Sequence, residues 1–524
     1  MKAIYTFAFL ASLSLGAEAQ NAYDAMDLAT KDLNGTARYV SMGGALSALG
    51  GDVSSMHSNP AGTALFKSSS FVVGAGGMLT NESVLGQSST KIGFDYIGAV
   101  FSFSDDPDDN PFKLGIGIKN DRNYFGNLGV NVGGLTVNGI PAFSQTYQIA
   151  DYANAAEYNN NWGILADISA ESEKHPGILA REAVKRYERI DTMYVGRPAN
   201  SAQYYRATHG YNTVCDLNVS VNIDDRFFIG ANLGVHWLEM QRLSEYSENG
   251  IYVDSEGQSF DTRYLFENFY ETTGYGVDFK IGAIVRPFED SPFRFGFTYK
   301  TPTAYSLTDR STTTLYYGAS HLNDRYDADS YSIPSGDYEY KYNDPWSINF
   351  SLGYTVGKKF AIGAEYEYED FSNANYSSAY YSIADDITFR KMNQTIKKTA
   401  KAQHTFKIGT EFKPVDNISL RLGYNYIKSP YVTGSFKELA YDGDPSETDW
   451  INWKNVQRIT AGIGFRFERC FLDFAYQYHM QKGDFYAFND VVYDDINKNC
   501  EIYLEPTEVN LNRGKLQVTF GVRF

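Results

Sequence analysis

The last ten residues, KLQVTFGVRF (Lys515–Phe524), decide the fold class of this chain. Apolar and polar side chains alternate along them, with one set being Leu516, Val518, Phe520, Val522 and Phe524 and the other Lys515, Gln517, Thr519, Gly521 and Arg523. Successive side chains of a strand point to opposite faces, so this segment is a strand between two different solvents. Transmembrane β-barrels have this pattern, with apolar side chains toward lipid and polar ones toward the lumen.

The same alternation returns in thirteen earlier segments. The predicted strands span 71–79, 92–103, 112–124, 207–223, 227–245, 272–287, 293–310, 340–356, 359–373, 401–414, 418–430, 452–468, 470–486 and 514–524. Connections after even-numbered strands are short and those after odd-numbered strands are long, as in barrels with periplasmic turns and extracellular loops. We therefore predict an all-β fold, a 14-stranded antiparallel transmembrane β-barrel with both termini in the periplasm. Closure leaves no unpaired edge facing lipid.

The composition agrees with a barrel in an outer membrane. The chain of 524 residues contains 42 Tyr and 35 Phe, which suits aromatic girdles at two membrane interfaces. Residues 1–19 read as a secretory signal peptide, in which Lys2 precedes an apolar stretch and Ala17-Glu18-Ala19 forms the cleavage site. A net charge of −17 argues against a nucleic-acid partner.

The three cysteines fall in regions that are far apart in the predicted barrel. Cys215 is expected on a lipid-facing position, Cys470 at a periplasmic turn and Cys500 in an outer loop. A disulfide requires Cα atoms within about 7 Å, so we expect free thiols.

Charges of both signs are predicted to face the lumen. The alternation points seven of them inward, namely Glu365, Glu367, Glu369, Lys407, Arg421, Arg466 and Arg523. Two interpretations remain open: ion pairs that stiffen the barrel, or a role in conduction and selectivity. Strand 92–103 differs, because apolar residues occupy both of its faces, and Tyr96 and Val100 are candidates for an apolar lumen.

The longest connection, about 125–206, exceeds an ordinary loop. Leu179, Ala183, Tyr187, Ile190 and Tyr194 recur in it at spacings of three to four residues, which predicts a helix. Such a helix either covers the mouth of the barrel or packs on neighbouring loops.

The segment 20–67, which precedes the first strand, is rich in small residues. It contains GTARYVSMGGALSALGGDVSSMHSNPAG, with glycine pairs at Gly43-Gly44 and Gly50-Gly51 and the triplet Asn59-Pro60-Ala61. Glycine permits close backbone packing in a confined space. We expect this segment to fold back into the barrel as a plug.

This stretch resembles the N-terminal signature of FadL/TodX-type outer-membrane transporters of long-chain fatty acids and other hydrophobic compounds. The resemblance rests on the Asn59-Pro60-Ala61 triplet after the glycine-rich run. The part of the chain that matches the family's motif is roughly residues 20–70. It implies a 14-stranded barrel (68–524) with a hatch (20–67) in the lumen. It also implies an apolar pocket beside the hatch and sideways release through a gap caused by a kinked strand.

Catalytic motifs are missing from the sequence. The seven histidines lack metal-ligand spacing, and neither a G-x-S-x-G elbow nor a P-loop occurs. We expect no enzyme activity and no cofactor. The expected partners are a hydrophobic ligand, outer-membrane lipid with lipopolysaccharide, and the barrel assembly machinery, which would engage the terminal Phe524.

The function predicted from the sequence is passive uptake of hydrophobic small molecules across the outer membrane of a Gram-negative bacterium. One alternative is a barrel of the same family that docks secreted or other proteins through its loops. A second alternative is a diffusion porin for polar solutes.

The predicted topology can be tested by labelling single cysteines on intact cells in a cysteine-free background. Positions within 374–400 and 431–451 should react with an impermeant maleimide, because they lie in predicted outer loops. The turns at Asp224 and Asp416 should stay unlabelled, and label at Asp416 would overturn the topology.

Overall fold

The computed structural model describes residues 21–82, 88–103, 111–160, 180–186, 189–253, 259–288, 291–321, 327–438, 447–489, 492–495, 498–501 and 504–524. The predicted signal peptide lies outside these residues. Fourteen transmembrane strands form one closed antiparallel sheet, in which Ser70 of the first strand faces Arg523 of the last. The predicted fold class is therefore confirmed.

Twelve of the fourteen transmembrane strands are continuous: β1 (Ser70–Glu82), β2 (Ser88–Ser102), β3 (Phe112–Asn123), β9 (Ala199–Ile223), β10 (Phe227–Val253), β11 (Ser259–Val285), β17 (Phe360–Asp370), β19 (Ala402–Val415), β20 (Ile418–Ile427), β21 (Trp450–Arg466), β22 (Cys470–Tyr486) and β25 (Thr507–Arg523). The other two are β12 (Phe293–Lys300) continued by β13 (Ala304–His321), and β15 (Tyr338–Asn343) continued by β16 (Ser347–Val356). Pro302 and Pro345 lie at these two interruptions, because proline cannot donate a ladder hydrogen bond.

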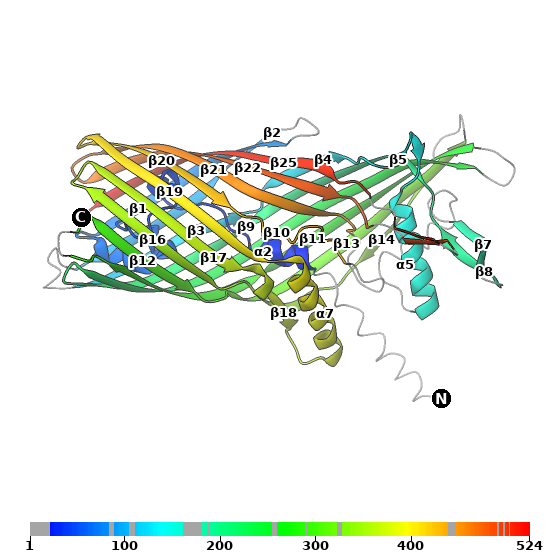
Figure 1. The fold of residues 1–524 in the computed structure, drawn as a ribbon, viewed down its shortest axis with the longest axis horizontal. Helices are drawn as coiled ribbons and strands as arrows, with labels where there is room; N and C mark the ends of the chain where they lie inside the picture. The colour runs from blue at the N-terminus through cyan, green and yellow to red at the C-terminus, as the bar shows by residue number, and fades with distance from the viewer. Residues whose placement is uncertain are drawn as a thin grey trace.

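Short turns and the C-terminus lie at one end of the barrel, and the loops gather at the other (Figure 1). The loop elements are β4 (Gly126–Asn131), β5 (Thr136–Val137), β6 (Ile140–Pro141), α5 (Gln145–Asn159), β7 (Ala180–Arg186), β8 (Arg189–Val195), β14 (Asp327–Pro334), η3 (Phe371–Asn373), β18 (Asn375–Ser378), α7 (Ile383–Thr399), β23 (Val492–Asp495) and β24 (Lys498–Glu501). The short turns mark the periplasmic end and the loops the outer end.

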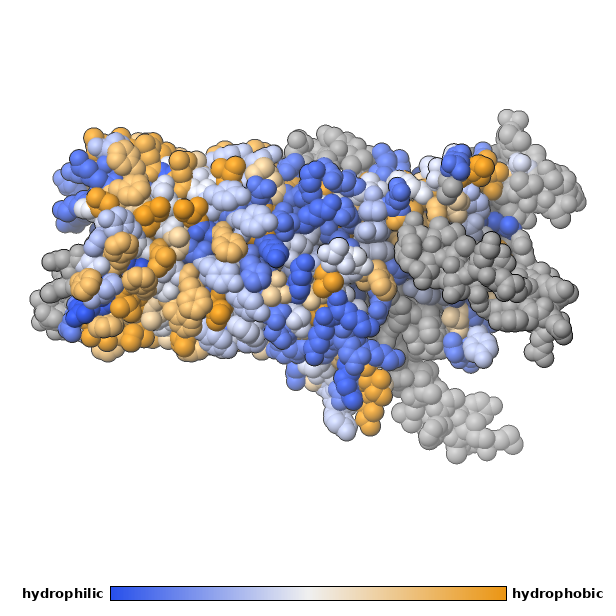
Figure 2. All heavy atoms as spheres, viewed as in Figure 1, coloured by the Kyte–Doolittle hydropathy of each residue, from blue (hydrophilic) through white to orange (hydrophobic). Residues whose placement is uncertain are grey.

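The two faces of the wall match the predicted alternation. Phe520 is 44% exposed on the outside, whereas Thr519 is fully buried on the inside. Figure 2 shows apolar side chains gathered over the half of the barrel nearer the short turns. Cys215 and Cys470 are free thiols, as predicted. The side chain of Cys500 lies outside the described residues.

The helix predicted around residues 179–194 is wrong. Residues 180–186 and 189–195 form the antiparallel hairpin of β7 and β8, and the helix of this connection is α5, at 145–159. Val184, Ile190 and Val195 are β-branched and favour a strand, so the spacing of the apolar residues misled the prediction.

The segment before β1 lies inside the barrel. Its helices are α2 (Ala22–Ala29), α3 (Ala37–Ser41), α4 (Ser55–Ser58) and η1 (Pro60–Leu65). The Asn21 carbonyl accepts a hydrogen bond from Tyr376 near the outer loops, whereas β1 begins at the periplasmic end. The described N-terminus is therefore in the outer half of the lumen, although both terminal strands end on the periplasmic side. No helix of the described residues is long and apolar enough to span a membrane.

Glycines on the inner wall of the barrel let this N-terminal segment approach closely. A Cβ at Gly363 would collide with the Ala45 carbonyl, and one at Gly409 with the Met42 carbonyl. Further contacts of this kind occur at Gly230 with Pro60, Gly282 with Asn59, Gly423 with Gly43, and Gly462 with Ser41. The wall is thus shaped around the segment on several sides.

The outward position of Phe520 can be tested by Phe520→Asp. A carboxylate facing hydrocarbon costs up to about 2 kcal/mol, depending on its depth, so we expect assembly to be impaired. Heat-modifiable mobility of the folded barrel on SDS gels measures this, with Phe520→Leu as the apolar control. Normal assembly of the Asp variant would place Phe520 away from lipid.

The close packing of the N-terminal segment can be tested by Gly363→Val. The added side chain would strike Ala45, and overpacking costs about 1–3 kcal/mol, so the segment should shift while the strands still pair. We expect ion conductance in planar bilayers that the unmodified barrel lacks. Gly93→Ala is the control, because a Cβ there meets nothing within 4 Å. Equal conductance of all three proteins would show that the segment does not close the lumen.

Candidate lumenal binding site

The predicted hatch motif anchors the N-terminal segment to the barrel wall. Asn59 is fully buried; its side-chain oxygen accepts a hydrogen bond from the Ala61 N–H (3.1 Å), and its amide donates to the Ala283 carbonyl (3.3 Å). The Pro60 carbonyl accepts from Asn218 of β9 (3.2 Å). The triplet thus starts η1 against β9–β11.

The two glycine pairs shape the path of the segment. Gly43, Gly44, Gly50 and Gly51 all have positive φ, between 58° and 74°. Gly43 also lies against the opposite wall, where its carbonyl accepts from Asn425 of β20 (2.6 Å). Asn59, Pro60 and Gly43 thus attach the segment to two parts of the wall. None of the seven motif residues lines the cavity described below.

Tyr96 and Val100 point inward from β2, as the sequence suggested. Both are fully buried against Val53 and Met56, and the Tyr96 hydroxyl donates to the Val53 carbonyl (3.0 Å). They pack on the N-terminal segment and do not line the described cavity, so their role in ligand binding stays a prediction.

A cavity of about 300 Å³ lies between the N-terminal segment and the wall. Ten cations contribute to its lining: Lys31, Lys119, Arg122, Arg206, Arg242, Lys280, Lys300, Lys407, Arg458 and Arg513. The lining contains five carboxylates: Asp27, Asp32, Asp121, Glu367 and Glu369. A set of apolar side chains completes the lining, among them Leu128, Ile427, Trp453, Val456 and Leu511. The cavity is therefore amphipathic, with an excess of positive charge.

Most of the lining cations are held by carboxylates of the wall and of the N-terminal segment. Arg122 pairs with Asp27 (2.6 Å), and Lys31 pairs with Glu369 (2.8 Å). Lys407 pairs with Glu367 (2.9 Å). The first two pairs tie the segment to the wall, and the third joins β19 to β17 within the wall.

His57 of α4 joins two strands below the cavity. Its Nε2 lies 3.2 Å from Asp121 of β3, and its Nδ1 lies 3.2 Å from Asp216 of β9. The Lys280 ammonium lies 3.3 Å from the same Nδ1. Within the described chain, no group of three or more His, Cys, Asp or Glu residues could hold a metal ion.

Arg458 of β21 is paired differently from most of the lumenal cations. Its guanidinium donates to His479 Nδ1 (3.1 Å), and among the described residues no carboxylate oxygen lies within 4.0 Å of it. Arg513, His479 and the Asp32 carboxylate also line the cavity. This cluster can accept the anionic group of a ligand.

The wall of the barrel opens beside the cavity. β2 pairs with β1 as far as Ser88, but its pairing with β3 extends only from Ser102 to Tyr96, opposite Lys119. Beyond that point β3 has a bulge at Asp121 and continues against β9, followed by β4 against the same strand. Within the described ladder pairs, β2 and β3 thus separate toward the outer end, and we call this separation the seam.

The N-terminal segment takes the place of β2 along the free edge of β3. The Asp32 N–H donates to the Asp121 carbonyl (3.0 Å), and the Asp32 carboxylate accepts from the Asn123 N–H (3.0 Å). A second cavity, of about 40 Å³, lies here between Phe94 of β2 and Asn123, and shares Arg513 with the main cavity. The seam therefore adjoins the lumenal cavity.

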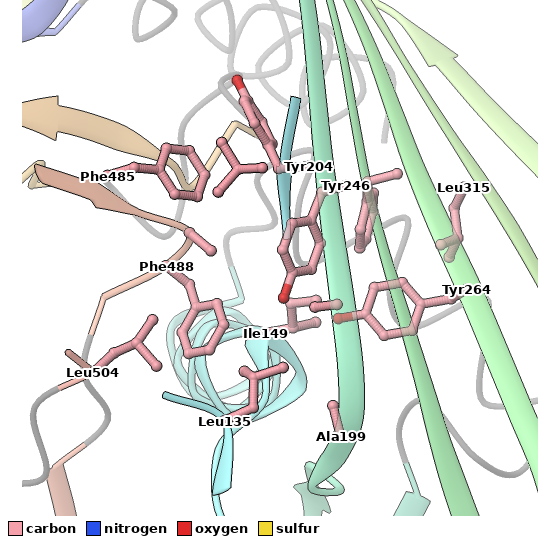
Figure 3. Close-up of a cluster of buried hydrophobic side chains, with 14 of the residues drawn as sticks. Leu135, Ile149, Ala199, Tyr204, Tyr246, Tyr264, Leu315, Phe485, Phe488 and Leu504 are labelled. Atoms are coloured by element: carbon pink, nitrogen blue, oxygen red, sulfur yellow. The ribbon is translucent and has the colours of Figure 1, made fainter. Parts of the chain in front are cut away.

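The outer mouth is covered by an aromatic cluster from opposite sides of the barrel. The rings of Tyr204 and Phe485 are 4.8 Å apart, and Tyr246 and Phe488 meet edge to face at 6.4 Å. Figure 3 shows Ile149 of α5 lying among these side chains. The α5 helix and its neighbours form a cap over the outer end of the lumen.

A buried carboxylate fixes α5 in this cap. Glu248 accepts hydrogen bonds from the Gln145 N–H (2.7 Å) and from the Ser144 hydroxyl (2.5 Å) at the start of the helix.

Five of the seven predicted inward charges form ion pairs between neighbouring strands or with the N-terminal segment: Glu365, Glu367, Glu369, Lys407 and Arg421. Arg421 pairs with Glu411 (2.7 Å) and Asp473 (2.6 Å), and Arg38 of the segment pairs with the same Glu411 (3.0 Å). This geometry favours the structural interpretation for Arg421. The sequence analysis missed Arg458, although its inward position follows from the alternation along β21. It also missed the Asp121 bulge, which has no sequence signature.

The comparisons with solved structures return outer-membrane channels at low sequence identity. A FadL homologue of Pseudomonas aeruginosa has 12% identity and a TM-score of 0.46, with 94% of this chain and 99% of that chain covered. The Ralstonia pickettii toluene transporter TbuX has 11% identity and a TM-score of 0.47, with the same shares covered. The Pseudomonas putida toluene transporter TodX has 11% identity and a TM-score of 0.44, with 95% of this chain and 100% of that chain covered. No curated protein sequence matches the chain.

A protein-family model matches part of the chain. Residues 266–491 match the model described as "Outer membrane protein transport protein (OMPP1/FadL/TodX)". This family consists of transport channels and not of enzymes, and its members are β-barrels of the Gram-negative outer membrane. This match, which covers less than half of the chain, confirms the resemblance to the FadL/TodX family seen in the N-terminal motif.

Proposed function

We propose that this barrel mediates passive uptake of hydrophobic small molecules, and that long-chain fatty acids are among them. The observation that carries the proposal is the amphipathic cavity beside the N-terminal segment. A fatty acid combines an apolar tail with a carboxylate. Trp453, Val456 and Ile427 suit the tail, and Arg458 suits the carboxylate.

The charged lining of the cavity supports a carboxylic acid as the ligand rather than a neutral hydrocarbon. Burying a cation without an opposite charge costs free energy. Arg458 has no carboxylate oxygen within 4.0 Å among the described residues, so it favours ligands that bring a negative charge. Toluene, which the related TodX and TbuX transport, has no such group. The apolar pocket that the resemblance implied is therefore proposed here as an apolar wall opposite a cationic one.

We propose lateral release through the seam between β2 and β3. The bulge at Asp121 turns β3 away from β2, and the smaller cavity lies between the main cavity and this opening. An exit into the membrane spares an apolar tail the passage through water. The N-terminal segment, the hatch of this proposal, closes the direct route to the periplasm.

Five further assignments belong to this proposal, three of chain segments and two of partners. Residues 1–19 are removed as a signal peptide, residues 20–67 act as the hatch, and residues 68–524 form the barrel. Lipopolysaccharide surrounds the outer half of the barrel, and the assembly machinery binds the end of the chain at Phe524.

The two alternative functions give different outcomes. A diffusion porin would conduct ions steadily, whereas the hatch and the aromatic cap support a closed lumen. A docking barrel would purify with a protein partner and without a lumenal ligand. Mass spectrometry of small molecules retained by the purified protein separates the alternatives, and a retained fatty acid supports the transporter.

Deletion of Asp121 tests the release route. Without the extra residue, β3 can pair regularly with β9 and can extend its pairing with β2, which closes the seam. We expect uptake of labelled oleate to fall to the level of cells that lack the protein, while the purified barrel still retains ligand. Asp121→Asn is the control, because it keeps the bulge and removes only the charge. Undiminished uptake by a folded deletion variant would contradict release through the seam.

A further inference from the structure

The helix α7 projects sideways from the barrel wall close to the outer aromatic girdle. Tyr368 at the end of β17 contacts Trp346 (ring centroids 5.7 Å apart) and His404 (5.6 Å) on the outside of the wall. The chain leaves this girdle after Asp370, forms β18 and α7, and returns through Ala402. Figure 1 shows α7 and β18 beside the barrel and not over its mouth. Because lipid surrounds the wall at the girdle, α7 lies above lipid.

One face of α7 packs on the barrel, and the other is cationic. Phe389 and Ile396 are buried, together with Thr399. The exposed side contains four cations in two pairs one heptad apart, Arg390, Lys391, Lys397 and Lys398, beside one exposed carboxylate, Asp386. Ile383 and Ile387 are also exposed on this helix. Residues seven and eight apart lie on one side of a helix, so the four cations form a stripe.

Lys428 extends this stripe onto the girdle. It follows the last residue of β20, its side chain is exposed, and its backbone N–H donates to the His404 carbonyl (2.9 Å). We call Arg390, Lys391, Lys397, Lys398 and Lys428 the outer basic patch.

These cations differ from those of the lumen in their partners. Lys398 lies 3.9 Å from Glu438, a weak and exposed pair. Among the described residues, no carboxylate lies within 4.0 Å of the other four members, whereas the lumenal Lys31, Lys407 and Arg421 each have one within 3 Å. Unpaired cations in a chain with a net charge of −17 indicate a surface that meets an external anion.

We propose that the outer basic patch binds the phosphates of lipopolysaccharide in the outer leaflet. Basic clusters beside a membrane interface bind anionic headgroups, and the aromatic girdle fixes the depth of the wall at this position. The patch lies above lipid and next to the girdle, so a headgroup reaches it without leaving the membrane. The inference rests on the outer-membrane location and not on the transport proposal.

The test compares three proteins purified from outer membranes in detergent. The five-site variant carries Arg390→Gln, Lys391→Gln, Lys397→Gln, Lys398→Gln and Lys428→Gln. The matched control removes five exposed lysines elsewhere, through Lys341→Gln, Lys358→Gln, Lys359→Gln, Lys454→Gln and Lys482→Gln. Heat-modifiable mobility verifies folding. Retained lipopolysaccharide is quantified from its hydroxy fatty acids, and lipid A binding is titrated by native mass spectrometry.

We expect the five-site variant to bind lipid A about tenfold more weakly than the unmodified protein and the control. The unmodified protein should also bind phosphorylated lipid A about tenfold more tightly than dephosphorylated lipid A, and added salt should remove this preference. Equal binding of both lipids would overturn the proposal, even if the five-site variant failed to fold. Equal binding by a folded five-site variant, or an equal loss in the control, would overturn it as well.

Discussion

Hydrocarbon offers no hydrogen bonds to a peptide group, and this constraint organises the whole structure. Every strand that crosses the membrane needs a partner on both sides, so β1 closes the sheet by pairing with β25 from Ser70 to Glu82. The same constraint makes the separation of β2 and β3 informative. Beyond the bulge at Asp121, the edge of β3 that no longer pairs with β2 forms hydrogen bonds with the backbone and the side chain of Asp32 from inside the barrel. The N-terminal segment therefore completes the hydrogen bonding of the wall as well as filling the lumen.

Charge inside the barrel follows from a related argument. A lumen enclosed by a low-dielectric wall does not tolerate isolated charges, so most lumenal cations have a carboxylate partner. Several of these pairs connect the segment to the wall, as with Lys31 and Glu369 or Arg38 and Glu411. The contacts that hold the segment are thus ion pairs, hydrogen bonds and close approaches to glycines of the wall, and they occur on several sides. Such a plug fits closely, and its release requires that several charges find new partners or water at once.

The proposed ligand site is built around a lumenal cation that lacks a direct carboxylate partner. Arg458 is held by His479, and among the described residues no carboxylate oxygen lies within 4.0 Å of it; Trp453 and Val456 line the same cavity. The outer basic patch repeats the same logic on the outside, where unpaired cations face the membrane. In both places the absence of an internal partner points to an external anion: a carboxylate in the lumen and a phosphate at the membrane surface.

The sequence alone determined the strand number, the orientation of the faces and the two kinds of connection. These features depend on the alternation of apolar and polar side chains, which follows from lipid on one face and water on the other. The alternation is local to each strand and can be recognised from the sequence. The hatch motif also identified the segment that fills the lumen. The tertiary structure decided the features that depend on partners distant in sequence: the bulge at Asp121, the hairpin at 180–195, the outer position of Asn21 and the cluster around Arg458. Ion pairing between residues hundreds of positions apart leaves no periodic trace, so the cavity and the seam became visible only when the closed barrel placed those side chains together.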